Sequence, residues 1–282
     1  MAIFNRDTNT GALTYSTKIS DGDALTGGGN VDGLGGANSV AVSTDGKNVY
    51  VTGENDNALA VFNRNTSTGV LTFSTVFKDG TDGVDGLATP KSVTVSEDGK
   101  NVYVASDGDD ALAVFTRNTS TGALTFSPVF KDGSGGVDGL NAAWSVAVSQ
   151  DGKNVYVVGR YAAALAIFNR DTNTGALTYS TKISDGDALT GGGNVDGLGG
   201  ATSVAVSENG KHVYVAGFSD NALAVFNRDT TTGVLTYSTV FTSHTNGVDG
   251  LNGAYSVAAS QDGKNVYVVS LGDSALVVFT WE

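Results

Sequence analysis

The chain has 282 residues, no cysteine and a formal net charge of −13, because 29 acidic residues outnumber 16 basic ones. The absence of cysteine excludes disulfides, thiolate zinc sites and cysteine nucleophiles. The acidic balance argues against nucleic acid as a partner, since such binding depends on Lys and Arg at the phosphates, and no apolar run is long enough to predict a membrane span.

In chain order, the first β-type runs are Met1–Arg6 and Leu13–Thr17. No signal peptide opens the sequence, and Met1–Arg6 instead matches the end of a later structural unit. Three further runs follow at Ser39–Ser43, Asn48–Thr52 and Ala58–Asn63. The first two of these are separated by an Asp-Gly turn, which predicts a tight hairpin because Gly accepts the positive φ of such turns.

The same pattern recurs to the end of the chain, with counterparts that begin at Ser92, Ser145, Ser203 and Ser256. Each unit also contains a Val-Asp-Gly-Leu motif, whose aspartate recurs every 53 residues with one interval of 58. Four strands per unit and no helical periodicity predict an all-β fold, a β-propeller of about five four-stranded antiparallel blades built from 53–58-residue tandem repeats. A β-solenoid is the alternative, but these units are long for its rungs.

We expect one propeller domain over residues 1–282. Its repeat units are approximately 3–60, 61–113, 114–166, 167–224 and 225–277, with 278–282 closing or extending the last blade. A closed five-bladed ring needs Leu13–Thr17 to complete the blade that ends in Ala275–Trp281, which leaves Met1–Arg6 as a surplus strand. The simpler interpretation is a frayed terminus or a piece of a longer array.

The alternative interpretation of the surplus strand is self-association. An unpaired strand can join molecules by strand addition. The residues that would take part are Met1, Ala2, Ile3 and Phe4, together with the strand from Ala275 to Trp281.

The motif SVAVSxDGKxVYV, followed by ALAVFxR and TGxLT, resembles the bacterial YVTN/lactonase-like β-propeller repeat. The resemblance covers essentially the whole chain and implies a propeller fold. The family includes surface and secreted repeat proteins as well as phosphogluconolactonase-like enzymes, which resemble a seven-bladed arrangement.

The third unit departs from the others and supplies the best candidate binding residues. Its loops carry Trp144, Arg160 and Tyr161, and Tyr255 occupies the Trp144 position in the fifth unit. Together these residues predict an aromatic and cationic patch suited to a sugar or to a partner protein. His244 is a candidate base or ligand in the last Gly-rich loop, although ordinary loop drift and a solvated histidine are the simpler interpretations.

Acidic, glycine-rich loops predict calcium as the one candidate cofactor, because Ca²⁺ takes six to eight oxygen ligands. The candidate ligands are Asp79, Asp82, Asp85, Asp107, Asp109 and Asp110. No EF-hand or nonapeptide calcium repeat is present. The alternative is that these aspartates are turn formers that bond to backbone N–H groups.

The sequence contains no G-x-S-x-G elbow, H-E-x-x-H motif or P-loop. From this we predict a non-catalytic propeller scaffold or binding module for a protein or glycan, located outside the cell or at its surface, and not an enzyme. The first alternative is a self-assembling structural subunit that exchanges its surplus strand. The second is a lactonase-like hydrolase.

Overall fold

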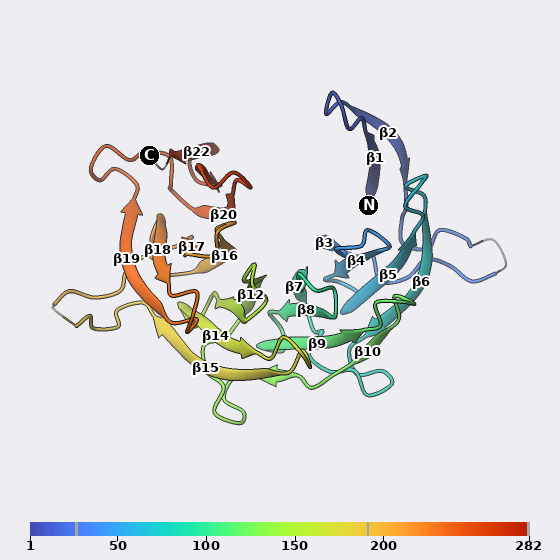
Figure 1. Cartoon of the computed structure of the whole chain (residues 1–282), viewed down its shortest axis with the longest axis horizontal. Helices are drawn as coiled ribbons and strands as arrows, with labels where there is room; N and C mark the ends of the chain where they lie inside the picture. Colours follow the sequence, from blue (N-terminus) through green and yellow to red (C-terminus); the bar gives the residue numbers. More distant parts are fainter. Residues whose placement is uncertain (26–27, 191, 281–282) are drawn as a thin grey trace.

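The structure is a computed structural model that describes residues 1–25, 28–190 and 192–280. Among these residues all regular elements are β-strands, arranged as antiparallel sheets that follow one another around an open arc (Figure 1). No helix in the described part of the chain is long and apolar enough to cross a membrane. The predicted all-β propeller class is confirmed.

Four complete blades occupy the middle of the described chain, and we call their strand positions A to D from the centre of the arc outward. The first blade comprises β3 (Ala37–Val42), β4 (Asn48–Gly53), β5 (Ala58–Arg64) and β6 (Leu71–Lys78). The second comprises β7 (Pro90–Val95), β8 (Asn101–Ser106), β9 (Ala111–Arg117) and an outer strand divided into β10 (Leu124–Phe126) and β11 (Phe130–Lys131). The third comprises β12 (Ala143–Val148), β13 (Asn154–Gly159), β14 (Ala164–Arg170) and β15 (Leu177–Ser184), and the fourth β16 (Ala201–Val206), β17 (His212–Gly217), β18 (Ala222–Arg228) and β19 (Leu235–Thr242).

The turn between positions A and B shows why this repeat folds locally. Gly46 adopts a φ of 68°, which an L-residue rarely does, and its N–H donates to the carbonyl oxygen of Ser43 at 2.7 Å. The Ser43 hydroxyl donates to Asp45 at 2.6 Å and accepts the N–H of Asn48 at 2.9 Å. The turn therefore satisfies its own polar groups, and the following strand begins at Asn48.

The apolar core lies between neighbouring blades. Between the first and second blades, Tyr50 and Leu59 pack against Val104 and Phe115, and all four side chains are buried. Neither face of a blade is polar throughout, so each blade needs a neighbour on both sides to bury its apolar residues. The sheets at the two ends of the array lack one of these neighbours and therefore leave apolar residues exposed.

An arginine at the end of the position-C strand ties the second, third and fourth complete blades each to the preceding one. Arg170 is an example: its Nη2 donates to both carboxylate oxygens of Asp98, at 2.9 and 2.8 Å, and its Nε donates to the Tyr103 hydroxyl at 2.9 Å. The equivalent pairs are Arg117 with Asp45 and Arg228 with Asp151. We call each of these pairs an interblade clamp.

The two ends of the arc are incomplete blades. A two-stranded sheet, β1 (Ala2–Arg6) with β2 (Leu13–Lys18), precedes the first complete blade. A three-stranded sheet, β20 (Ala254–Ala259), β21 (Asn265–Ser270) and β22 (Ala275–Thr280), follows the fourth. The two sheets face each other across an opening (Figure 1).

The predicted closure of a five-bladed ring is therefore wrong. The strand containing Leu13–Thr17 pairs with β1 and not with β22, because the curvature set by the interblade packing leaves the two ends of the arc apart. Position C is filled at both ends, by β1 and by β22, so no strand is displaced. Trp281, which the sequence placed in the last strand, lies outside the described residues.

Candidate functional site

Each position-A strand in the described structure contains a β-bulge that decides which side chains line the centre of the arc. In β3, Ala37 and Ser39 pair with Gly53 and Thr52 of β4, and Asn38 between them is the extra residue. A bulge redirects its extra side chain, and bulges occur often beside active sites. The residues at this position are Asn38, Lys91, Trp144, Thr202 and Tyr255.

These residues surround a cavity of about 350 Å³ at the centre of the arc, which we call the axial cavity. Its lining consists of Asn38, Ser39, Glu54, Lys91, Ser92, Trp144, Ser145, Thr202, Ser203, Tyr255 and Ser256. The serines also join the blades, since the Val93 N–H donates to Ser39 Oγ at 3.1 Å and the same bond recurs between later blades. Each serine hydroxyl still carries a hydrogen that can be donated to a ligand.

An ion pair between Glu54 and Lys91 is the main electrostatic feature of the cavity. Lys91 Nζ lies 2.6 Å from Glu54 Oε1, and its side chain is only 10% exposed. Asn38 Nδ2 donates to the second Glu54 oxygen at 3.0 Å, and Asp107 lies 3.9 Å from the ammonium. Burial raises the pKa of Asp107, although the nearby Lys91 acts in the opposite direction. The cavity thus holds an ammonium group and a fixed carboxylate side by side.

Trp144 forms an aromatic wall of the cavity and contacts two cations. Lys91 Nζ lies 4.6 Å from the ring centroid, and the Arg160 guanidinium carbon lies 4.5 Å from it. Arg160 also lies 5.5 Å from the ring centroid of Phe218, in the next blade. Cations at these distances are attracted to the electron-rich face of an indole ring. Three blades therefore contribute to one aromatic and cationic surface.

The structure brings together only some of the candidate binding residues. Trp144 and Tyr255 line the axial cavity, and Arg160 stacks on Trp144 as the sequence suggested. Tyr161 is 78% exposed and is not among the residues that line the cavity. His244 lies in the loop before β20, where its Nε2 is 3.4 Å from Asp249 Oδ1 and both side chains are exposed. A binding role for this set stays a prediction.

Sequence reasoning missed Glu54 and Lys91 as functional candidates. They are 37 residues apart in different units, and neither belongs to a recognised motif. A signal for Lys91 was present: the residue before the repeated Ser-Val varies from unit to unit, while the rest of the strand is repeated. Glu54 had no comparable signal, because polar residues are common in the loops between positions B and C.

Three groups of aspartates recur in the loops between positions D and A and between positions B and C. Their ligand atoms lie within 4.8 Å of one another in the triads Asp21–Asp32–Asp56, Asp79–Asp85–Asp109 and Asp185–Asp196–Asp220. In the second triad, Lys131 Nζ lies 2.7 Å from Asp85 and 3.2 Å from Asp109. Burial and the neighbouring Asp109 and Asp85 carboxylates raise the pKa of Asp79. The triads are thus loop structures in which the carboxylates already have partners.

The six predicted calcium ligands do not form one site. Asp79, Asp85 and Asp109 gather in the second triad, whereas Asp107 lies beside Lys91 at the axial cavity. Asp110 accepts the Ala142 N–H at 2.6 Å and so joins two blades. Asp82 occupies a left-handed turn position with a φ of 52°. Calcium binding at the second triad stays a prediction.

Comparison with known proteins defines the family. The family described as "Lactonase, 7-bladed beta-propeller" matches residues 1–129 and 190–282. The chain belongs to this family. No curated protein matches the sequence.

Solved structures resemble this lactonase-family propeller along its full length. A putative 6-phosphogluconolactonase from Bacteroides uniformis ATCC 8492 is 20% identical with a TM-score of 0.73, and the match covers 100% of this chain and 74% of that one. The periplasmic gluconolactonase of Pseudomonas aeruginosa is 18% identical with a TM-score of 0.71, covering 100% of this chain and 73% of the other. At such identities the likeness establishes the fold.

Membership of the family corrects three predictions. The non-catalytic scaffold and the absence of enzyme activity were inferred from missing motifs, and a family of lactonases contradicts both. Self-association through Met1–Phe4 and the last strand stays a prediction. The count of five blades is also wrong for this family, which is seven-bladed. Local motifs are a poor guide here, because the residues that line the axial cavity come singly from separate blades.

Proposed function

We propose that the protein is a lactone hydrolase that works at the axial cavity. The observation that carries this proposal is the Lys91 ammonium, on a side chain only 10% exposed, beside the Glu54 carboxylate in a cavity that also presents an aromatic wall. Family membership and the gluconolactonase and 6-phosphogluconolactonase descriptions of its structural relatives support the same reaction class.

The proposal gives each group a role. Lactone hydrolysis adds water to the carbonyl carbon, places negative charge on the carbonyl oxygen, and then releases the ring oxygen as a hydroxyl group. In this proposal Lys91 stabilises that charge, because an ammonium already fixed by its ion pair with Glu54 needs little reorganisation. Glu54 is placed to accept the proton of the attacking water and return it to the ring oxygen. The product is a hydroxy acid.

The aromatic wall and the serines account for binding. The face of Trp144 can pack on the C–H face of a sugar-derived lactone, and the hydroxyls of Ser92 and Ser145 can donate to its oxygens. Arg160 and Lys91 favour a substrate that carries negative charge, as a phosphorylated sugar lactone does. We further propose a location outside the cytoplasm, which the periplasmic relative supports.

The test measures the rate at which the protein hydrolyses glucono-δ-lactone and its 6-phosphate. The acid released is titrated at constant pH, and the rate is compared with that of spontaneous hydrolysis. We expect Glu54→Gln and Lys91→Met each to lower kcat by about 100-fold or more, as loss of a proton acceptor or of a charge-stabilising donor does. Glu97→Gln removes a charge from an exposed turn away from the cavity and is the matched control. Turnover no faster than the spontaneous reaction, or unchanged in both variants, would refute the proposal.

A further inference from the structure

The centre of the arc carries pairs of side chains, one pair from each sheet that has a position-A strand. The first member is the bulge residue, and the second follows the position-B strand, where its N–H donates to the carbonyl oxygen two residues before the bulge residue. The pairs are Asn38–Glu54, Lys91–Asp107, Trp144–Arg160, Thr202–Phe218 and Tyr255–Leu271. These positions change from blade to blade, whereas the strands that carry them are repeated.

In the first blade a third residue joins the pair, and together they form a chain of hydrogen bonds. Thr52 Oγ1 donates to Asn38 Oδ1 at 2.6 Å, and Asn38 Nδ2 donates to Glu54 Oε2 at 3.0 Å. The other Glu54 oxygen accepts from Lys91 at 2.6 Å. Asn38 Nδ2 also donates to the Pro90 carbonyl oxygen at 3.1 Å. Both ends of the amide therefore have partners, which fixes its orientation. We call Thr52 and Asn38 the Glu54 support.

Thr52 is a polar residue at a position that is otherwise apolar. Its side chain is fully buried in β4, and the residues at the equivalent position of the later units are Ala105, Val158, Ala216 and Val269. A buried hydroxyl group is costly unless it forms a hydrogen bond, and this one donates to Asn38. Packing alone does not require a hydroxyl here, so its bond to Asn38 is the feature that explains it.

Asn38 is not required for the strands to form. Residues 2–43 and 166–207 are identical except at one position, which is Asn38 in the first segment and Thr202 in the second. Both segments fold into the same position-A strand with the same bulge. Thr202 Oγ1 donates to the Ala254 carbonyl oxygen at 3.2 Å, and its paired residue is Phe218. The asparagine is thus present in the segment whose pair contains a carboxylate.

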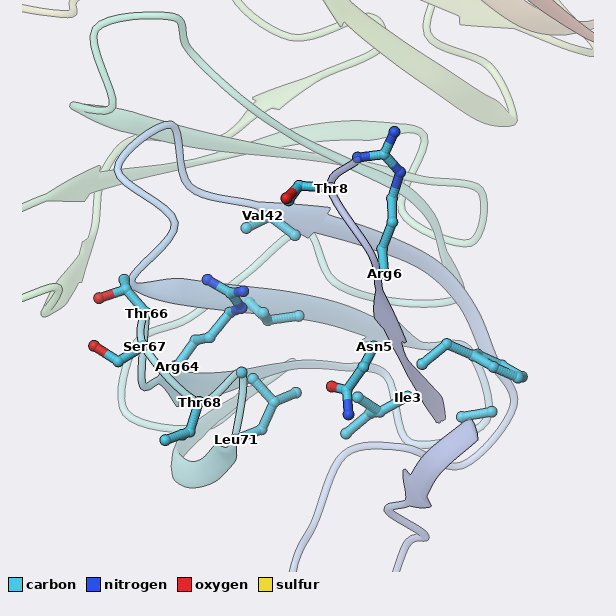
Figure 2. A pocket seen from close by; sticks show the side chains of 14 residues that line it. Ile3, Asn5, Arg6, Thr8, Val42, Arg64, Thr66, Ser67, Thr68 and Leu71 are labelled. Atoms are coloured by element: carbon cyan, nitrogen blue, oxygen red, sulfur yellow. The ribbon is translucent and has the colours of Figure 1, made fainter. Parts of the chain in front are cut away.

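A larger cavity of about 610 Å³ lies between β1 and the first complete blade and is separate from this arrangement (Figure 2). Ile3 lines it from β1, and Leu71 lines it from the first blade. Neither Thr52 nor Asn38 is among its lining residues, whereas Asn38 and Glu54 both line the axial cavity. The chain of hydrogen bonds therefore belongs to the axial cavity.

We propose that Asn38 and Thr52 are positioning residues that hold the Glu54 carboxylate in place to accept the proton of the attacking water. A glutamate side chain in a loop has several rotamers, and each one that points away from the water is unproductive. Fixing the carboxylate in advance lowers the entropic part of the barrier. Thr52 does not line the cavity, so it acts through Asn38. This proposal rests on lactone hydrolysis at the axial cavity.

The test compares the kinetics and stability of two variants, with glucono-δ-lactone as the substrate. Thr52→Val introduces the residue found at the equivalent positions 158 and 269, so the strand keeps its apolar packing. We expect kcat to fall about threefold with KM unchanged, and the free energy of unfolding not to fall. Asn38→Thr, which copies the second segment, should lower kcat about tenfold. In a Glu54→Gln background neither change should lower kcat further, because both act through that carboxylate.

Val158→Thr is the matched control. It places a hydroxyl at the position equivalent to Thr52 in the third blade, where the bulge residue is Trp144 and offers no acceptor. The free energy of unfolding should fall, since a buried hydroxyl loses its hydration, while kcat stays the same.

The outcomes separate this proposal from the proposed function. Wild-type turnover with kcat unchanged in both Thr52→Val and Asn38→Thr would overturn the positioning role and leave lactone hydrolysis standing. Losses of kcat that are as large in the Glu54→Gln background as in wild type would also overturn it, because the two residues would then act elsewhere. Wild-type turnover no faster than the spontaneous reaction would overturn both.

Discussion

The interblade clamp formed by Arg170 offers a sharp test of how this propeller is held together. Its side chain is only 1% exposed and donates to groups on two blades: Asp98, Asn101 and Tyr103 of the preceding blade, and Gly152 of its own. We expect Arg170→Ala to reduce the free energy of unfolding, because it leaves a carboxylate and three other acceptors without their donor.

The size of the effect follows from the type of bond. Removing one partner of a buried ion pair typically lowers the free energy of unfolding by about 3–5 kcal/mol, and losing one neutral hydrogen bond by about 0.5–1.5 kcal/mol. Because the Asp98 side chain is 29% exposed, we expect a loss at the lower end, about 3 kcal/mol. Arg64 is the matched control in the same molecule, since in the described structure its side chain donates a hydrogen bond to the Gly46 carbonyl oxygen and to no other blade. Arg64→Ala should therefore cost about 1 kcal/mol.

Urea unfolding, monitored by circular dichroism, gives the free energy of unfolding of both variants. Although burial acts in the opposite direction, hydrogen bonds from Ser96 and Arg170 hold the pKa of Asp98 below its ordinary value of 3.8. The clamp is therefore fully present above that value and is lost as the pH falls through the lower, folded-state pKa. The difference between wild type and Arg170→Ala should shrink in that acidic range. Equal costs for Arg64→Ala and Arg170→Ala at neutral pH would refute this reasoning.

Three further predictions concern the core, the cavity wall and the second aspartate triad. The Phe115 ring centroid lies 5.1 Å from that of Phe77 and 5.5 Å from that of Phe126. Phe115→Ala should therefore lower the free energy of unfolding, measured by thermal unfolding, by about 3–5 kcal/mol. Phe4→Ala, at the equivalent but exposed site in β1, should lower it far less. Trp144→Leu should raise KM for a sugar lactone about tenfold, with little change in kcat, because the ring acts in binding; an equal loss in kcat would contradict this role. Lys131→Met removes the cation from the second triad, so calcium should raise the melting temperature of this variant more than that of wild type, and no shift in either would count against calcium.

The axial cavity was only partly predictable, for a physical reason. Trp144 and Tyr255 stood out because they break an internal repeat, and the structure places both on the cavity. Glu54 and Lys91 meet across two blades, and their contact depends on the angle between those blades. That angle is a property of the packed core, so no local pattern records it.

The sequence by itself determined the blade. Apolar alternation and Asp-Gly turns are local signals, and the predicted runs Asn48–Thr52 and Ala58–Asn63 differ from β4 and β5 by one residue at an end. Tertiary structure alone decided the curvature of the array. The tilt between blades is set by contacts such as Phe77 with Phe115 and by clamps between residues 72 positions apart, and it leaves an arc where a closed ring of five was expected. One repeat unit encodes its own strands, but only the packing of successive units determines how many of them make a ring.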